Sequence, residues 1–275
     1  MKRFSIVIPS FNHGEYLERA LCSAIDQAEA DTEILVVDGG STDGSVAIIR
    51  RHEKALSWWC SERDSGQSEA LNKGFSQAHG EYLLWLNADD LLLPGTLNRV
   101  RAHLEAHPTC EWLAGNLVYI DGWDRVLRCA RDGRWHDRLY RHAAVRVYGP
   151  TSIFKRTLFE RVGGFDESLR YVMDTDLWLR FKAVGARFER LPYYCWAFRV
   201  HAGSKTSGDL SGITDPQMAE ERSRMCAKNG LTVTRVGLLM QRGWRLLNGC
   251  YARAWWDTRR YCGLSVAAIG RVKRK

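Results

Sequence analysis

The pattern of apolar and polar positions along the first hundred residues predicts strands and helices in alternation. Apolar runs typical of buried strands lie at 4–10, 33–45, 56–63 and 82–90. Segments with the i, i+3, i+4 apolar spacing of amphipathic helices lie between them, at 14–28, 44–56 and 66–78. Regular alternation of this kind predicts a parallel sheet covered by helices. The fold class is therefore α/β, with a Rossmann-like, mostly parallel central sheet and flanking helices.

The pattern becomes less regular after residue 100. We expect a helix, a hairpin, a strand with a short helix, a second helix and an extended run, at 99–107, 113–130, 149–169, 174–188 and 193–201. The hairpin is expected to turn at Asp121-Gly122. A regular half followed by an irregular half suits a site shared between two substrates.

Polar residues follow each predicted strand of the first half at its carboxyl end. They are Ser10 and Asn12, Asp38, Glu62 to Asp64, and Asp89 with Asp90. One polar strand end can be explained as a helix cap. Four of them at the same edge of a parallel sheet indicate a binding site, because ligands bind beyond the carboxyl ends of such strands.

The neighbouring acids Asp89 and Asp90 raise a question of charge. Two adjacent carboxylates repel each other and cost several kcal/mol if they are dehydrated without partners. A hard divalent cation that bridges a diphosphate would explain them. The chain has neither a phosphate-binding G-x-x-x-x-G-K-[ST] loop nor a G-x-G-x-x-G after the first strand. We therefore expect metal and side chains to hold the diphosphate.

Composition favours an ordinary folded protein on the cytosolic side of a membrane. The apolar share is 45% and the charged share 26%. No stretch approaches the roughly 18 apolar residues of a membrane span, and the first apolar run is too short for a signal peptide. The eight cysteines include no C-x-x-C pair and no Cys/His cluster at zinc spacing, which favours free thiols.

The net charge of +8 belongs to the C-terminal region. Residues 231–275 contain ten Lys or Arg and one acid, whereas 1–230 is close to neutral. Interleaved arginines, leucines and tryptophans predict a basic amphipathic helical tail that lies on an anionic membrane surface. Packing of this tail on the main domain is the alternative. Nucleic-acid binding is not expected, because the main domain offers no chemistry that would use it.

Five ordered motifs resemble those of family 2 glycosyltransferases. They read SIVIPSFN, VVDGGSTDGS, SERDSGQSEALNKGF, GEYLLWLNADD with PG behind it, and GGFDESL…MDTDLWLR. The resemblance implies the GT-A fold and transfer from a nucleotide-sugar with inversion of the anomeric centre. On this basis residues 1–230 are a GT-A domain, with 1–100 as the nucleotide-sugar-binding half and 101–230 as the acceptor-side half.

The resemblance also implies which residues hold the donor. Asp38 would accept a hydrogen bond from the nucleotide base, and Arg63 with Asp64 would continue the base and ribose pocket. The full donor-binding set that it implies is Pro9, Ser10, Asn12, Asp38, Arg63, Asp64, Asn72, Asn87 and Asp90.

A metal ion, Mn2+ or Mg2+, is implied at the D-x-D position of the family. Asp89 would be a ligand, and His201 matches a histidine that in several relatives approaches the metal or diphosphate. A single histidine after a strand can also be structural. The first acid of the motif is replaced here by Asn87, which removes one charge from the site.

The catalytic base implied by the family is the aspartate of an acidic pair, and that residue is Asp174. The glutamate of the pair is replaced here by Met173. Asp174 would accept the proton of the acceptor hydroxyl. Asp176 would lie on another face of the helix and pair with Arg180.

The leading hypothesis is a glycosyltransferase of bacterial surface polysaccharide biosynthesis. Its donor would be a nucleotide-sugar, with UDP as the first choice of nucleotide and GDP or dTDP as the others. Its acceptor would be a saccharide or a lipid-linked compound with a free hydroxyl. It would be cytoplasmic, peripheral on the inner face of the plasma membrane. The alternatives are a sugar-nucleotide nucleotidyltransferase, which normally opens with a glycine-rich basic loop, and a non-catalytic nucleotide-sugar-binding protein.

Overall fold

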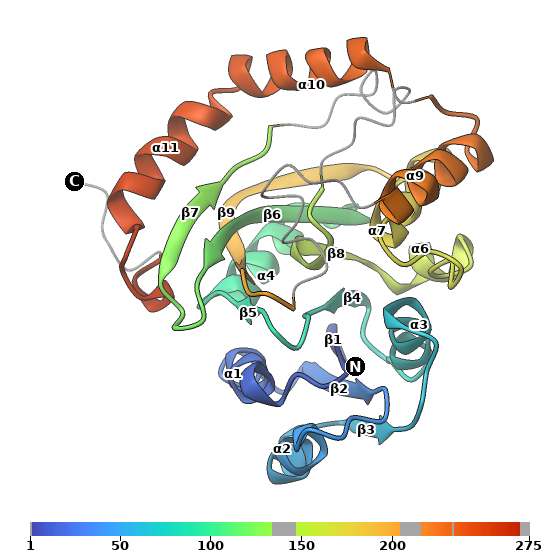
Figure 1. Ribbon diagram of the computed structural model, residues 1–275, viewed down its shortest axis with the longest axis vertical. Helices are drawn as coiled ribbons and strands as arrows, with labels where there is room; N and C mark the ends of the chain where they lie inside the picture. The colour runs from blue at the N-terminus through green and yellow to red at the C-terminus, as the bar shows by residue number, and fades with distance from the viewer. Residues whose placement is uncertain (1, 134–146, 204–215, 233, 270–275) are drawn as a thin grey trace.

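The computed structural model describes residues 2–133, 147–203, 216–232 and 234–269. A single curled sheet runs through this part of the chain, and helices cover both of its faces (Figure 1). The strand order is β3-β2-β1-β4-β8-β6-β9-β5, and β7 pairs with β6 outside this path. The α/β fold that the apolar pattern predicts is confirmed.

The first four strands form the parallel part of the sheet. They are β1 (Phe4–Ser10), β2 (Thr32–Asp38), β3 (Trp58–Ser61) and β4 (Tyr82–Trp85). The intervening helices are α1 (Gly14–Ile25), α2 (Ser45–His52) with the 3-10 turn η1 (Glu53–Ala55), and α3 (Gln67–Ser76). The last strand is shorter than the predicted 82–90, because the Asp90 N–H donates to the Asn87 carbonyl and turns the chain.

The second half of the chain adds a mixed part to this sheet. Its elements are β5 (Leu91–Leu92), α4 (Thr96–Ala106), β6 (Trp112–Ile120), β7 (Val126–Ala130), the 3-10 turn η2 (Gly149–Thr151), β8 (Ser152–Lys155), α6 (Arg156–Arg161), α7 (Met173–Ala183) and β9 (Phe188–Arg199). Strands β6 and β9 are parallel, whereas β5, β7 and β8 pair antiparallel with their neighbours. The predicted hairpin is β6-β7.

The helix predicted at 174–188 is wrong in its last residues. Helix α7 ends at Ala183, and Gly185 adopts a φ of +80°, a left-handed conformation that glycine reaches without strain. Phe188 is the first residue of β9, where its ring packs on Trp112 with centroids 4.5 Å apart. A local apolar pattern cannot tell that packing from a further helical turn.

The central parallel strands β1, β2 and β4 are mostly apolar because they are buried on both faces. In β1, Phe4, Ile6 and Ile8 pack in the core beneath α1, α2 and α4. Val7, which points the other way, packs in the core beneath α3 and α7. The parallel part of the sheet therefore sits between two hydrophobic layers, and polar residues such as Ser10 and Asp38 lie at its strand ends.

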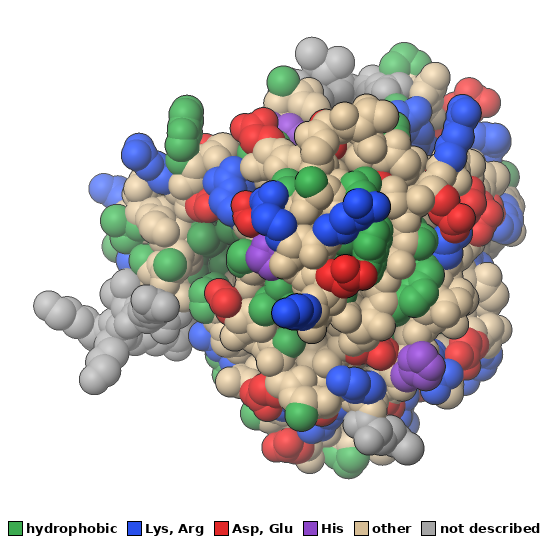
Figure 2. Space-filling view, turned by 90° about the horizontal axis from the view of Figure 1, so that it is seen from below, with side chains coloured by type: hydrophobic (Ala, Val, Ile, Leu, Met, Phe, Trp, Pro, Cys, Tyr) green, Lys and Arg blue, Asp and Glu red, His purple; other side chains and the backbone are tan. Residues whose placement is uncertain are grey.

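The C-terminal region is helical, with α9 (Pro216–Lys228), α10 (Arg235–Leu247), α11 (Cys250–Tyr261) and the 3-10 turn η3 (Val266–Ala268). Helix α11 lies along β7, where the Cys129 N–H donates to Thr258 Oγ1 at 2.9 Å (Figure 1). One side of the tail thus packs on the sheet. Seen from below, acidic and basic side chains are interspersed over the parallel half (Figure 2).

Candidate active site

The carboxyl ends of β1, β2 and β4 meet at one rim of the sheet. Ser10 and Asp38 are partners in the register of β1 and β2, and the Gly39 N–H donates to the Ser10 carbonyl at 2.8 Å. On the other side of β1, the Leu86 N–H donates to the Val7 carbonyl at 2.9 Å. The polar residues that follow these strands therefore leave the sheet side by side.

Asp38 is buried and organises the loop after β2. Its Oδ2 accepts hydrogen bonds from the Ser41 N–H at 2.9 Å and from Ser61 Oγ at 2.7 Å, and its Oδ1 accepts from Ser41 Oγ at 2.5 Å. Asn12, in the left-handed region with a φ of +54°, donates its N–H to the same Ser41 hydroxyl. Asp38 and Asn12 thus hold one loop, and their contacts with a nucleotide stay predictions.

Pro9 and Ser10 form the floor of this rim at the end of β1, where both are buried. The Ser10 hydroxyl has no hydrogen-bond partner among the described residues. A buried hydroxyl without a partner carries the cost of its lost hydration. A polar ligand at the rim would supply that partner.

Arg63 and Asp64 lie on the loop that follows β3. Arg63 is exposed, whereas Asp64 packs so closely on the turn after β2 that a Cβ at Gly39 would lie 2.8 Å from Asp64 Oδ2. Burial raises the pKa of the Asp64 carboxyl, and the charges of Glu69 and Asp38 add to this effect. The two loops therefore form a continuous wall.

Asn72, one of the predicted donor-binding residues, makes hydrogen bonds to the loop before α7. Its Nδ2 donates to the Phe165 carbonyl at 3.0 Å and to Glu167 Oε1 at 2.8 Å, and its Oδ1 accepts from the Phe165 N–H at 2.9 Å. Asn72 thus ties α3 to the loop before α7. This position adds no support to its predicted contact with a donor.

Asn87 and Asp90 stabilise the turn between β4 and β5. Asn87 accepts from Gln67 Nε2 at 2.8 Å and donates to Asp90 Oδ2 at 2.9 Å. Asp90 is 1% exposed, and its Oδ1 accepts the Arg199 N–H at 2.8 Å. Burial, followed by the charge of Asp89, raises the pKa of Asp90 well above its ordinary value. The second acid of the pair is therefore an internal support of the turn.

Asp89 reaches the rim and meets His201, which lies just beyond the end of β9. The two predicted metal ligands are in contact, with His201 Nε2 at 2.9 Å from Asp89 Oδ2. The Gly203 N–H points at His201 Nδ1 at 3.2 Å, so Nδ1 accepts and the proton is on Nε2. The Tyr16 ring packs on the imidazole with centroids 4.9 Å apart.

Arg199 is a residue of this site that the sequence analysis missed. Its side chain is fully buried, and its Nε donates to the Asp89 carbonyl at 2.7 Å. Its other nitrogens reach the β6-β7 hairpin, at the Asp121 carbonyl (2.8 Å) and Asp124 Oδ1 (2.6 Å). An arginine inside the apolar run before His201 was the available signal, because a buried guanidinium needs several acceptors.

Asp174 lies at the start of α7, against the end of β4. Its Oδ1 accepts the Thr175 N–H at 2.6 Å. Its Oδ2 faces η2, since a Cβ at Gly149 would lie 3.1 Å from this oxygen and 2.7 Å from Cζ2 of Trp85. Burial raises the pKa of the Asp174 carboxyl, which strengthens it as a base.

Asp176 takes part in the structural contact that its helix position predicts. It is fully buried, and its Oδ2 accepts from Arg180 Nε at 2.8 Å while its Oδ1 accepts from Asn229 Nδ2 at 3.3 Å. The two neighbouring acids of α7 thus face different surroundings: Asp176 pairs with Arg180, whereas Asp174 Oδ2 lies beside Gly149 of η2.

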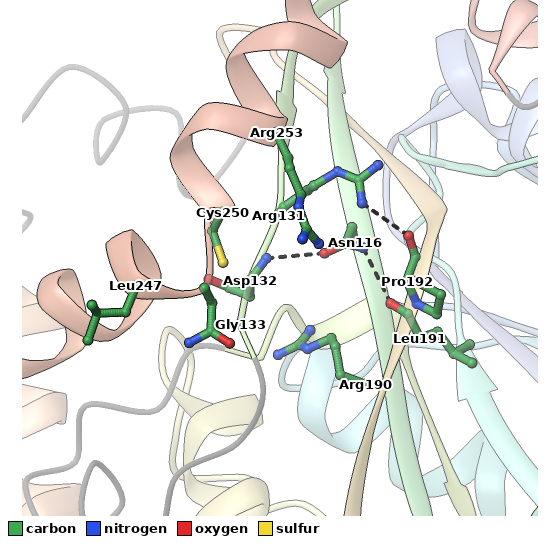
Figure 3. Close-up of a pocket in the computed structure, with 11 residues that line it drawn as sticks. Asn116, Arg131, Asp132, Gly133, Arg190, Leu191, Pro192, Leu247, Cys250 and Arg253 are labelled. Atoms are coloured by element: carbon green, nitrogen blue, oxygen red, sulfur yellow. Dashed lines mark hydrogen bonds between the residues drawn. The ribbon is translucent and has the colours of Figure 1, made fainter. Parts of the chain in front are cut away.

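Two further features lie outside the rim. A cavity of about 510 Å³ between the tail and β9 is lined by Arg131, Arg190 and Arg253, with Leu191 and Leu247 at its side (Figure 3). A separate group of metal-ligating residues, His103, His107 and Glu189, lies near the start of β9. His201 is beyond the opposite end of that strand, so this group is not the predicted donor-metal site.

Within the described part of the chain, no helix is both long and apolar enough to cross a membrane. All eight cysteines are free thiols, as their spacing predicted.

Comparisons with known proteins identify a family and related sequences for this chain. The family model described as "Glycosyl transferase family 2" matches residues 5–163. An uncharacterized glycosyltransferase of Rickettsia prowazekii is 27% identical over 220 residues, which cover 77% of this chain and 68% of the relative. A PGL/p-HBAD biosynthesis glycosyltransferase of Mycobacterium bovis is 32% identical over 186 residues, covering 64% of this chain and 68% of the relative.

Two solved structures share the fold. S. aureus TarS 1–349 in complex with UDP-GlcNAc has a TM-score of 0.66 and 18% identity, covering 94% of this chain and 77% of that one. The mannosyltransferase PcManGT from Pyrobaculum calidifontis, in complex with GDP-Man and Mn2+, has a TM-score of 0.57 and 21% identity, covering 97% and 77%. At these identities the likeness establishes the GT-A fold alone. Because the family model matches more than half of the chain, the protein belongs to glycosyl transferase family 2.

Proposed function

We propose that the protein is a metal-dependent inverting glycosyltransferase, which moves a sugar from a nucleoside-diphosphate donor to a hydroxyl of a saccharide or lipid-linked acceptor. The observation that carries this proposal is the contact between Asp89 and His201 at the sheet rim. These two residues are distant in sequence, and they join only because the end of β9 returns to the end of β4.

The donor set at the rim fits a divalent cation. A carboxylate and an imidazole are both side chains that bind divalent cations, and carboxylate oxygens in particular suit Mg2+ and Mn2+. Asp89 Oδ2 and His201 Nε2 are separated by 2.9 Å; for both to face one ion, the ring proton of His201 would have to sit on Nδ1, which would replace the present contact of Nδ1 with the Gly203 N–H. When bound, Mn2+ or Mg2+ would neutralise the charge of the leaving diphosphate. PcManGT, which shares the fold, is described with Mn2+.

Asp174 is the proposed general base. Its half-buried carboxylate would take the proton of the acceptor hydroxyl while that oxygen bonds to the anomeric carbon. The bond from that carbon to the diphosphate breaks on the opposite side, and the leaving group departs with the electron pair. A single displacement of this kind inverts the anomeric centre and needs no covalent nucleophile.

The proposed donor pocket consists of the loops held by Asp38 and Asn12, the wall at Arg63 and Asp64, and the buried Ser10 hydroxyl. A uridine, guanosine or thymidine diphosphate would meet these groups, and UDP is our first choice. TarS and PcManGT are described with UDP-GlcNAc and GDP-Man.

A lipid-linked acceptor at the cytoplasmic face of a membrane is the proposed setting, in bacterial surface polysaccharide biosynthesis. Val236, Leu239, Leu246 and Leu247 are exposed along one side of α10 and suit the surface of a bilayer. The arginine-lined cavity beneath the α10–α11 junction would receive an anionic group of such an acceptor (Figure 3).

Calorimetry with UDP, GDP, dTDP and CDP, each with and without Mn2+, tests the donor site. Manganese-dependent binding of one nucleotide is expected, and loss of that dependence in Asp89→Ala. No binding of any nucleotide by the folded protein would refute the proposed donor site. Release of free sugar or glycosylated acceptor from the matching nucleotide-sugar excludes the non-catalytic alternative, and pyrophosphate formation would instead indicate a nucleotidyltransferase.

A further inference from the structure

A second set of metal-ligating side chains lies away from the rim, where the end of α4 meets the start of β9. His103 is in the last turn of α4, His107 directly follows the helix, and Glu189 is the second residue of β9. One potential ligand atom from each residue lies within 4.8 Å of the other two. We propose that these three residues form a zinc site that is separate from the donor-metal site.

The two imidazoles are arranged to serve one ion. The rings of His103 and His107 stack with centroids 4.2 Å apart and planes 20° apart. His107 Nδ1 lies 2.9 Å from the His103 carbonyl oxygen. That oxygen can only accept, so the proton is on Nδ1 and the Nε2 lone pair is available to a metal.

Glu189 brings a carboxylate to the same point. Its Oε2 is 2.6 Å from His103 Nε2, and both side chains are largely buried.

The ligand types favour zinc over the ions expected at the rim. Two imidazoles and one carboxylate with a fourth position open to water form a well-known tetrahedral zinc arrangement. Mg2+ prefers oxygen ligands and octahedral geometry. An ion here would join α4 to β9 and stabilise the folded chain by mass action. The sequence showed no zinc cluster because Glu189 reaches the histidines only through the fold.

Titration of the metal-free full-length protein with ZnSO4 against a chromophoric chelator tests the proposal. We expect one tight site in the unaltered protein, and a zinc-dependent rise in Tm. His107 is exposed, so His107→Ala should keep the fold and weaken zinc binding at least about 100-fold, since even outer-shell changes cost 10- to 100-fold. His52→Ala, which alters a histidine on α2, is the matched control and should leave the titration unchanged.

Two further variants make the result decisive. Glu189→Gln should also weaken zinc binding, whereas Asp89→Ala should leave it intact, because the rim is a different site. The proposal is overturned if the unaltered protein binds no zinc, or if His107→Ala and Glu189→Gln bind it as tightly as the control. Loss of zinc binding in Asp89→Ala alone would assign the ion to the rim and would also overturn it.

Discussion

Neighbouring acids in this protein have different roles because they face different surroundings. Asp89 reaches the rim beside His201, while Asp90 is buried beneath it and supports the turn through Asn87 and Arg199. The same division separates Asp174 from Asp176 on α7. The proposed chemistry uses one carboxylate of each pair, Asp89 and Asp174, whereas the other carboxylate makes hydrogen bonds within the fold.

Asp174→Asn should remove turnover and leave donor binding intact. The amide has the same shape and still accepts the Thr175 N–H, but it cannot take a proton from the acceptor. General-base catalysis contributes about 10²- to 10⁴-fold, so a fall of that size in kcat is expected. Steady-state kinetics gives kcat, and calorimetry gives the nucleotide Kd.

Asp176→Asn is the matched control on the same helix. Removing this charge leaves Arg180 without its buried partner, at a cost of about 3 kcal/mol in stability. Its main effect should therefore be a lower Tm. Equal losses of kcat in the two variants, without loss of stability, would contradict the assignment of Asp174.

The pH dependence of activity should reflect the raised pKa of Asp174. The base must be ionised, so kcat/KM falls as the pH decreases through that pKa, which lies above the ordinary value of about 3.9. Because the folded state binds this proton more tightly than the unfolded state, ionisation of Asp174 destabilises the fold as pH rises through the same range. At neutral pH, Asp174→Asn should therefore unfold at an equal or higher temperature. A lower Tm would contradict this account.

At the scale of elements, η2 packs against α7 at Asp174, the proposed base. A Cβ at Gly149 would lie 2.7 Å from the Trp85 ring and 3.1 Å from Asp174 Oδ2. Gly149→Ala should therefore displace Asp174 and lower kcat by about 10- to 100-fold. Gly122→Ala, where a Cβ would meet nothing within 4 Å, is the control. Normal kinetics in Gly149→Ala would show that the base does not depend on this contact.

The outer side of α10 provides a second prediction at this scale. Leu246 and Leu247 are 68% and 82% exposed, so replacing both with Asp should not disturb the fold. The double variant should sediment with phosphatidylserine vesicles at least about tenfold less than the unaltered protein, because it loses apolar contact and adds repulsion. Val184→Asp, at an exposed position after α7, is the control. Unchanged sedimentation of the double variant would refute a membrane role for α10.

At the scale of the whole molecule, the proposed donor site joins the two halves of the chain. Asp38 and Asp89 come from the parallel half, and His201 and Asp174 come from the mixed half. Mn2+ with the matching nucleotide, at about 100 times its Kd, should add about 2.7 kcal/mol to the stability of the whole protein. A single unfolding transition should shift upward in calorimetry, and Asp89→Ala should show no shift. A shift confined to one of two transitions would show that the halves unfold independently.

Much of the parallel half and the family could be predicted from the sequence, because their signals are local. Buried strands appear in the sequence as continuous apolar runs. The polar residues at their ends can be identified because they directly follow these runs in the sequence. Helix ends were less predictable, as the early end of α7 at Ala183 shows. The contacts of Asn72 with the loop at 165–167 could not be predicted, because they depend on how α3 packs against a distant segment.

The sequence by itself determined the alternation of strands and helices along the parallel half, the acids at the strand ends and the basic character of the tail. The tertiary structure decided which of these groups meet. Arg199 and His201 reach the Asp89–Asp90 turn only because β9 pairs with β5, and His107 and Glu189 meet only because α4 ends beside the start of β9. The physical reason is the distance along the chain over which the interactions act. Secondary structure depends mainly on residues close in sequence, whereas a site is assembled by strand pairing and packing between distant segments.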